Sequence, residues 1–209
     1  MDIGALLSQI DFGTYWGIFF IGILIATTAM STGVDGAIFW APVLLLLYGV
    51  EPAAAVACAI FIELFGFGSG LYGYTKRKKV LFKQGAFLLI FTIPLGVLGA
   101  YISKILPINF LISIIAIICL VLAFSNFRRA ELEDHHKERD IKNPALKHKK
   151  LGGFLTSIGG FFAGAIGVGI GETNNYYLLI KNKYPATFAT GTTIFIIAVT
   201  DLFCSLFMG

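Results

Sequence analysis

The sequence predicts an all-α fold, a helical protein that crosses a membrane several times. Of its 209 residues, 57% are hydrophobic and only 13% are charged, whereas a soluble domain carries about 25% charged residues. A soluble fold with this composition would lack the polar surface to cover its core. The apolar runs are long and continuous and do not alternate, which argues against a transmembrane barrel. The composition therefore excludes a soluble enzyme and a disordered chain.

The apolar segments divide into full-length spans and two shorter pieces. A span of the hydrocarbon core needs about 20 helical residues. The full-length segments are 12–30, 52–74, 85–102, 107–123, 151–170 and 186–208. The short segments are 36–50 and 173–180. We predict that these are short helices that cross with help from neighbours, or re-entrant elements in which broken backbone is shielded by protein.

The basic residues predict the orientation of the spans. Residues 75–83 are strongly basic, and residues 128–150 carry eight basic and five acidic side chains. Both stretches are expected on the cytoplasmic side, where loops are enriched in lysine and arginine. Counting crossings from them places the N-terminus outside and the basic residues 181–183 inside.

Two stretches of the chain share one order of features: a glycine cluster, a short apolar segment, a proline and a long span. The clusters begin at Gly33 and Gly167, and the prolines are Pro52 and Pro185. The distance in sequence between the two glycine clusters and that between the two prolines differ by one residue. The charge pattern predicts opposite topology for the two units. Inverted units with interrupted helices at matching positions are typical of secondary transporters. A chance likeness between glycine-rich apolar stretches is the alternative.

These features divide the chain into a first repeat (1–125), a cytoplasmic polar loop (126–150) and a second repeat (151–209). The second repeat has no counterpart of residues 85–123, so we expect it to be incomplete. The chain is then either a truncated form or a short variant that completes itself as a homo-oligomer.

The glycine clusters and the polar residues around them are the candidate substrate site. Broken helices would present unpaired N–H groups and a positive dipole end, which is an anion site made without lysine or arginine. Hydroxyl and amide side chains can add donors. The alternatives are close helix packing for the glycines and hydrogen bonds to the helix backbone for the threonines. The candidates are Gly33, Asp35, Gly36, Gly167, Gly169, Gly171, Glu172, Thr173, Asn174, Asn175, Thr190, Thr192 and Thr193.

Four acidic residues stand in apolar context and are the candidate proton-coupling groups: Glu172, Asp35, Glu63 and Asp201. A carboxylate at the centre of a span is costly, about 2.5–3.5 kcal/mol on insertion scales, and usually faces an aqueous path or the bundle interior. Asp35 has a second interpretation as the cap of the helix that begins near Ala37. Glu63 and Asp201 are equally consistent with neutral, hydrogen-bonded carboxyl groups.

No cofactor, metal site or nucleic-acid partner is expected. The sequence has no phosphate-binding loop and no basic face with interleaved aromatic residues. Its cysteines lie in apolar runs at unrelated spacings, and its histidines all fall in one polar loop. These residues are Cys58, Cys119, Cys204, His135, His136 and His148.

At these motifs the chain resembles the TauE/SafE sulfite-exporter-like permeases, also called toluene sulfonate uptake permeases. The resemblance rests on Gly33–Ala37 (GVDGA) followed by Pro42 and Leu44, and on a second-half motif. That motif comprises Gly167–Glu172 (GVGIGE), Pro185 and Thr190–Thr193 (TGTT). The likeness covers the chain from about Gly22 to its end. It implies secondary transport of small anions, often sulfite-like or organosulfur compounds, across the cytoplasmic membrane.

The leading hypothesis is therefore a multi-pass secondary transporter that carries a small sulfite- or organosulfonate-like anion with protons, and not an enzyme. Two other hypotheses remain. Intramembrane carboxyls without intramembrane cations favour a cation- or proton-conducting channel on charge alone. The missing counterpart of residues 85–123 favours a non-transporting subunit of a membrane complex.

Overall fold

The computed structural model describes residues 12–103, 105, 113, 117 and 146–208, and the side chains of residues 12–15, 53 and 208 are not described. Within these residues every element is a helix, which confirms the all-helical prediction. The elements are α2 (Phe12–Thr32), α3 (Ala37–Leu47), α4 (Pro52–Lys76), α5 (Phe82–Ser103), α7 (Lys149–Ile166), α8 (Ile170–Asn175), the π-helix η2 (Tyr176–Lys181) and α9 (Ala186–Met208). Most of the predicted span 107–123, most of the polar loop, Cys119, His135 and His136 lie outside the described residues.

Helix lengths agree in part with the division into long and short segments: the predicted full spans 52–74, 85–102 and 186–208 are long helices, whereas the described part of α2 from Trp16 and helix α7 do not meet the length and hydropathy of a full span. Among the described residues, three helices are long and apolar enough to cross a membrane: Ala54–Lys76, Phe82–Ser103 and Ala186–Phe207. The segment expected to be short in the first half is α3, which has 11 residues. The corresponding segment in the second half is α8 with six residues, continued by η2.

Glycines end the two long helices that precede the short ones. Gly33 has φ +69° after α2, and Gly167 has φ +80° after α7. At Gly169 φ is +138°, a backbone conformation that side chains with a Cβ rarely adopt. The predicted helix breaks at the two glycine clusters are therefore present.

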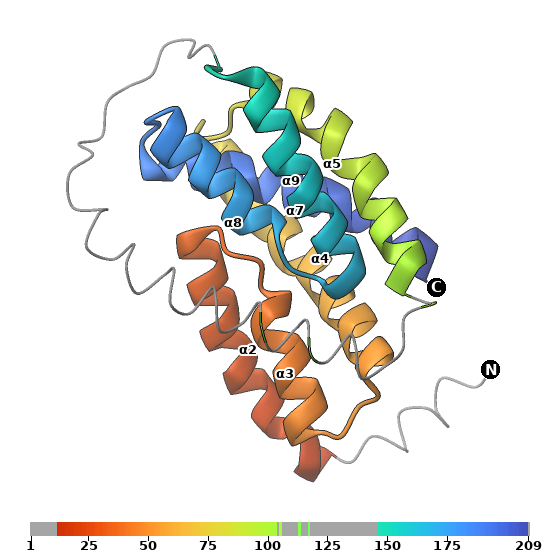
Figure 1. The fold of residues 1–209 in the computed structure, drawn as a ribbon. Coiled ribbons are helices and arrows are strands. Elements are labelled where there is room, and N and C mark those ends of the chain that lie inside the picture. The colour runs from red at the N-terminus through yellow and green to blue at the C-terminus, as the bar shows by residue number, and fades with distance from the viewer. Residues whose placement is uncertain (1–11, 104, 106–112, 114–116, 118–145, 209) are drawn as a thin grey trace.

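The two broken helix pairs point toward each other. Figure 1 shows α2 and α3 as one hairpin and α7 with α8 as another, approaching from opposite ends of the molecule. At the tips, the N–H of Gly171 donates to Asp35, and the Asn175 side chain donates to the carbonyl of Gly33. That the two units have opposite topology in the membrane stays a prediction. That the two units are a sequence repeat stays a prediction.

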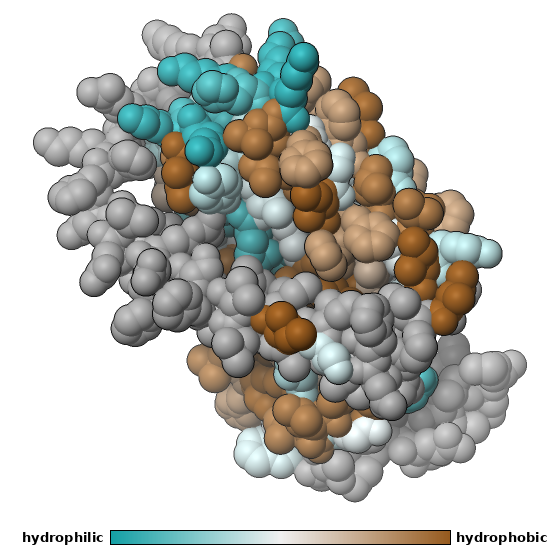
Figure 2. Space-filling view, viewed as in Figure 1, coloured by the Kyte–Doolittle hydropathy of each residue, from teal (hydrophilic) through white to brown (hydrophobic). Residues whose placement is uncertain are grey.

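The basic segments gather at one end of the molecule, which Figure 2 shows as its most hydrophilic region. The Lys79 ammonium lies 4.7 Å from the centre of the Phe188 ring at the start of α9. The backbone N–H of Lys147 donates to Asn182 Oδ1 at 2.7 Å. Segments around residues 79, 147 and 182 thus share one end, as the charge pattern predicts. The assignment of that end to the cytoplasm stays a prediction.

Helices α5 and α7 pack through glycine. A Cβ on Gly160 would lie 2.6 Å from the Thr92 carbonyl oxygen, and one on Gly164 would collide with the Gly96 carbonyl. Small residues allow two backbones to approach this closely inside a membrane. Gly160 and Gly164 thus allow close packing of α7 on α5, and this seam holds the second hairpin in place.

Candidate functional site

Asp35 lies in the first break and caps the helix of the second. Its Oδ2 accepts the N–H of Gly169 at 2.5 Å, and both of its oxygens accept the N–H of Gly171 at 3.1 Å. The side chain is 1% exposed. The sequence-based alternative, that Asp35 caps its own helix, is wrong. Gly36 is the N-cap residue of α3, and the backbone turn after Gly33 leaves Asp35 facing the other hairpin.

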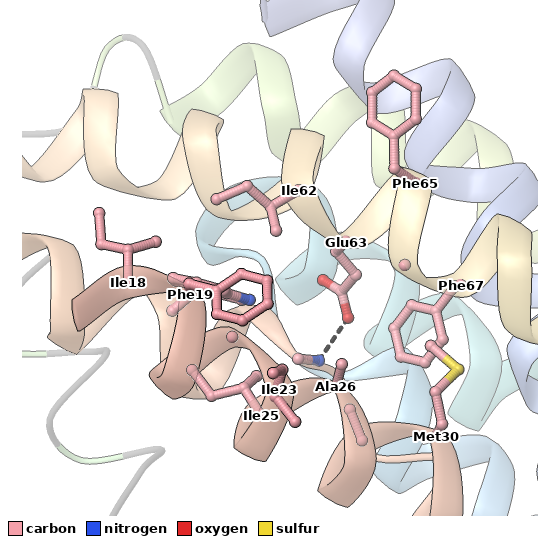
Figure 3. Close-up of a pocket in the computed structure, with 15 residues that line it drawn as sticks. Ile18, Phe19, Ile23, Ile25, Ala26, Met30, Ile62, Glu63, Phe65 and Phe67 are labelled. Atoms are coloured by element: carbon pink, nitrogen blue, oxygen red, sulfur yellow. Dashed lines mark hydrogen bonds between the residues drawn. The ribbon is translucent and has the colours of Figure 1, made fainter. Parts of the chain in front are cut away.

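Glu63 caps the start of α3, as Asp35 caps the start of α8. This residue of α4 accepts the N–H of Gly36 at 2.5 Å and the N–H of Ala37 at 3.3 Å. Figure 3 shows its carboxylate reaching from α4 to the start of α3. The sequence had predicted unpaired N–H groups at these helix ends. They are paired with the protein's own carboxylates, because the positive end of a helix dipole stabilises a negative side chain where no basic residue is present.

Asn175 joins α8 to the end of α2. Its Nδ2 donates to the carbonyl oxygens of Thr32 and Gly33, both at 3.0 Å. Its Oδ1 accepts the Thr193 hydroxyl at 3.4 Å. Thr190 packs on the same glycine, since a Cβ on Gly33 would lie 3.1 Å from the Thr190 methyl. Asn175, Thr190 and Thr193 are thus brought together at the first break.

Asn174 and Thr173 face a different neighbour. The Asn174 Oδ1 accepts the Thr156 hydroxyl of α7 at 2.8 Å, and the Thr173 hydroxyl donates to the Gly169 carbonyl at 2.7 Å. Asn174 is fully buried, and its Nδ2 has no hydrogen-bond partner among the residues that the structure describes. Sequence reasoning missed Thr156, and the only available signal was a polar side chain within the glycine-rich run of α7.

Thr192 lies away from the two breaks. Its hydroxyl donates to the Phe188 carbonyl at 2.7 Å and accepts the N–H of Leu81 at 3.0 Å. Leu81 belongs to the connection between α4 and α5, at the basic end of the molecule. The structure therefore uses Thr192 to fasten α9 to that connection and does not bring it to the other candidates.

The four candidate carboxyls form one electrostatic group. The Asp35 side chain interacts with that of Glu172. The charges of both Asp35 and Asp201 act on Glu63. Asp201 is 4% exposed, and its Oδ2 has no hydrogen-bond partner within the described part of the chain. The sequence has no lysine, arginine or histidine in residues 12–75, 151–180 or 184–208 to neutralise them.

The described residues offer no metal site, because no group of three or more histidine, cysteine, aspartate or glutamate side chains among them is placed to hold an ion. The described cysteines are unpaired: Cys58 is exposed and Cys204 is buried. What the arrangement offers chemically is a set of amide donors whose acceptors are carboxyl groups.

Comparisons with known proteins agree with this architecture. The family model for sulfite exporter TauE/SafE matches residues 18–208. Among curated proteins, the probable membrane transporter protein YunE of Bacillus subtilis (strain 168) is 24% identical over 200 residues, which cover 87% of this chain and 73% of that protein. No solved structure matches the chain. Since the family model spans nearly the whole chain, including both helix breaks, the protein belongs to the TauE/SafE sulfite exporter family and is an integral membrane transporter.

Proposed function

We propose that the protein is a secondary transporter of the cytoplasmic membrane that moves a small sulfite- or organosulfonate-like anion together with protons. One observation carries the proposal. Two opposed broken hairpins meet at their tips, and the amide groups at these tips are held by carboxyl groups that a proton can neutralise.

An anion and a carboxylate compete for the same donors. The N–H groups of Gly36 and Ala37 now donate to Glu63. A protonated carboxyl loses the negative charge that the helix end favours, so an anion can replace it on these N–H groups. The buried Nδ2 of Asn174 adds a donor that has no acceptor among the described residues. This exchange links anion binding to proton binding without any basic side chain.

Glu172 and Asp35 form the pair that we expect to hold the coupling proton. Their side chains interact, and both carboxyl oxygens of Glu172 are buried, as is Asp35. Two carboxyls in contact away from bulk water cannot both ionise easily, so the pair binds a proton as a unit.

The test is sulfite uptake by the full chain in proteoliposomes, with and without an imposed proton gradient. We expect the gradient to drive uptake, and Glu172→Gln to bind sulfite but lose the response to the gradient. Glu51→Gln is the matched control, because Glu51 is an exposed residue just before α4. Wild-type gradient dependence in Glu172→Gln would reject Glu172 as the coupling group.

A cation- or proton-conducting channel is the second candidate. It is favoured by the four interacting carboxyls and by the Asp201 Oδ2, which has no hydrogen-bond partner among the described residues. Replacing sulfite by sodium as the test ion in the same vesicles separates the two functions. Sodium flux without sulfite flux would establish the channel, and no flux of either ion would favour a non-transporting subunit.

A further inference from the structure

An apolar cavity separates α2 from α4. Its volume is about 580 Å³. Figure 3 shows its lining side chains between the two helices, with Glu63 reaching from α4 into the space between them. Apart from Glu63 and the indole of Trp40, every side chain on its wall is apolar. The two helices make few direct contacts, so the cavity is not closed by their packing.

Small side chains on both helices create this space. Gly22, Ala26 and Ala29 of α2 line it, as does Gly66 of α4. The Trp40 ring of α3 packs on Gly22, where a Cβ would lie 3.3 Å from its Cζ2. A tryptophan ring wedged against a glycine keeps α2 from closing onto α4.

The cavity lies at the depth of the bilayer's hydrocarbon. Glu63 is eleven residues into α4, about 17 Å along the helix axis, where a membrane has a hydrocarbon core about 30 Å thick. Three of the lining residues are themselves well exposed: Phe19 at 68%, Ile23 at 50% and Phe65 at 66%. Since these exposed side chains form part of the wall, the cavity opens sideways toward lipid.

The interior of the cavity suits a hydrocarbon ligand, because it offers no free polar group. Both oxygens of Glu63 already accept the N–H groups of Gly36 and Ala37, so a ligand gains no polar contact there. A helix from a second copy is about 10–12 Å across with its side chains. A single flexible chain of methylene groups is much thinner and has no polar group that would need a partner.

We propose that one acyl chain of a bilayer lipid occupies this cavity and reaches Trp40 and Glu63. The chain completes the wall that keeps water from the Glu63 carboxyl and from the two N–H groups it caps. Excluding water strengthens these hydrogen bonds, because they then act in a low dielectric. The proposal concerns a structural lipid and does not depend on which ion is carried.

Tryptophan quenching tests the proposal directly, because the chain has only Trp16 and Trp40. The full chain with Trp16→Phe is reconstituted in phosphatidylcholine vesicles with ordinary acyl chains, or with chains brominated at their middle. Bromine quenches tryptophan on contact. Trp40 is 7% exposed, so hydrocarbon that stays outside the protein cannot reach it. We expect brominated lipid to reduce Trp40 emission strongly.

Filling the cavity supplies the decisive control. Ala26→Phe should remove the quenching of Trp40, whereas Leu24→Phe should preserve it, because Leu24 is 69% exposed and does not line the cavity. In a Trp40→Phe chain, the exposed Trp16 should be quenched whether or not the cavity is filled, which verifies insertion. The proposal would be overturned if Trp40 emission were the same in brominated and in ordinary lipid. Emission that instead follows the protein-to-lipid ratio would indicate a second copy at the mouth and would also overturn it.

Discussion

At both helix breaks a carboxylate caps the N–H groups at the start of the short helix, but the two carboxylates come from different parts of the chain. At the first break, the start of α3 is capped by Glu63 from α4, which follows it directly in the chain. At the second break, the start of α8 is capped by Asp35, which belongs to the first break. One cap therefore lies within its own half of the molecule, and the other crosses between the halves.

This difference separates a contact inside one half from a contact between the two halves. If the hairpins move apart to expose the site, the bonds from Asp35 to Gly169 and Gly171 must break. So must the bonds from Asn175 to Thr32 and Gly33. The Glu63 cap joins α3 to α4 within one half, so this movement does not by itself break it. Asp35 is thus the group on which a protonation event can act as a release between the two halves.

The largest effect is expected from Gly171→Ala. A Cβ at Gly171 would lie 2.6 Å from the Gly33 carbonyl oxygen and 2.7 Å from the Asp35 N, closer than real Cβ atoms approach backbone. Both neighbours are main chain, so the tips must separate. We expect a loss of about 1–3 kcal/mol of stability and loss of sulfite flux, measured by thermal unfolding in detergent and in proteoliposomes.

Gly68→Ala is the control for that substitution, because a Cβ there meets nothing within 4 Å. If Gly171→Ala unfolds and transports like Gly68→Ala, the close contact of the two tips does not exist in the membrane.

The second prediction compares the two caps by hydrogen exchange. Asp35→Asn removes the charge on the α8 end, and Glu63→Gln removes the charge on the α3 end. Hydrogen bonds to charged groups contribute about 1.5–3 kcal/mol. We expect faster exchange at residues 169–175 in Asp35→Asn and at residues 36–47 in Glu63→Gln. Exchange changing in the same helix for both variants would contradict separate caps.

The third prediction concerns the side-chain tie between the halves. Asn175→Ala removes two hydrogen bonds to the end of α2, and a neutral bond contributes about 0.5–1.5 kcal/mol. Asn174→Ala removes one bond, to Thr156 within the second hairpin. We expect Asn175→Ala to speed exchange at the end of α2, and Asn174→Ala to leave that helix unchanged. Equal effects on α2 would show that the tie is not local to Asn175.

Hydropathy and glycine placement predicted most of the described helices and the two breaks, although the span predicted at 151–170 ends at Ile166 and the short helix begins at Ile170. A long apolar run forms a longer helix than a run of eleven residues, whatever surrounds them. Gly33 and Gly167 can take positive φ because they lack a Cβ. The caps could not be predicted in this way. That Asp35 bonds to Gly169 and not to its own helix depends on how two hairpins far apart in the chain meet.

Thr192 and Thr190 also show what the sequence could not predict. Both belong to one TGTT motif, yet Thr190 packs on Gly33 while Thr192 is bonded to Leu81. Residues two apart on a helix point in different directions, about 200° around its axis. The motif alone does not say which face of α9 meets the breaks, so the sequence grouped threonines that the fold separates.

The smallest effect is expected from Thr193→Val, which tests how much the weakest link between α9 and the breaks contributes. The Thr193 hydroxyl donates to Asn175 Oδ1 at 3.4 Å, beyond the usual 2.5–3.0 Å for hydroxyl donors. Valine keeps the shape, and we expect thermal unfolding to change by less than about 0.5 kcal/mol, well below the effect of Asn175→Ala. A loss as large as that of Asn175→Ala would mean that the Asn175 side chain is positioned by α9. Helix α9 would then help to hold the two breaks together, as Asp35 does.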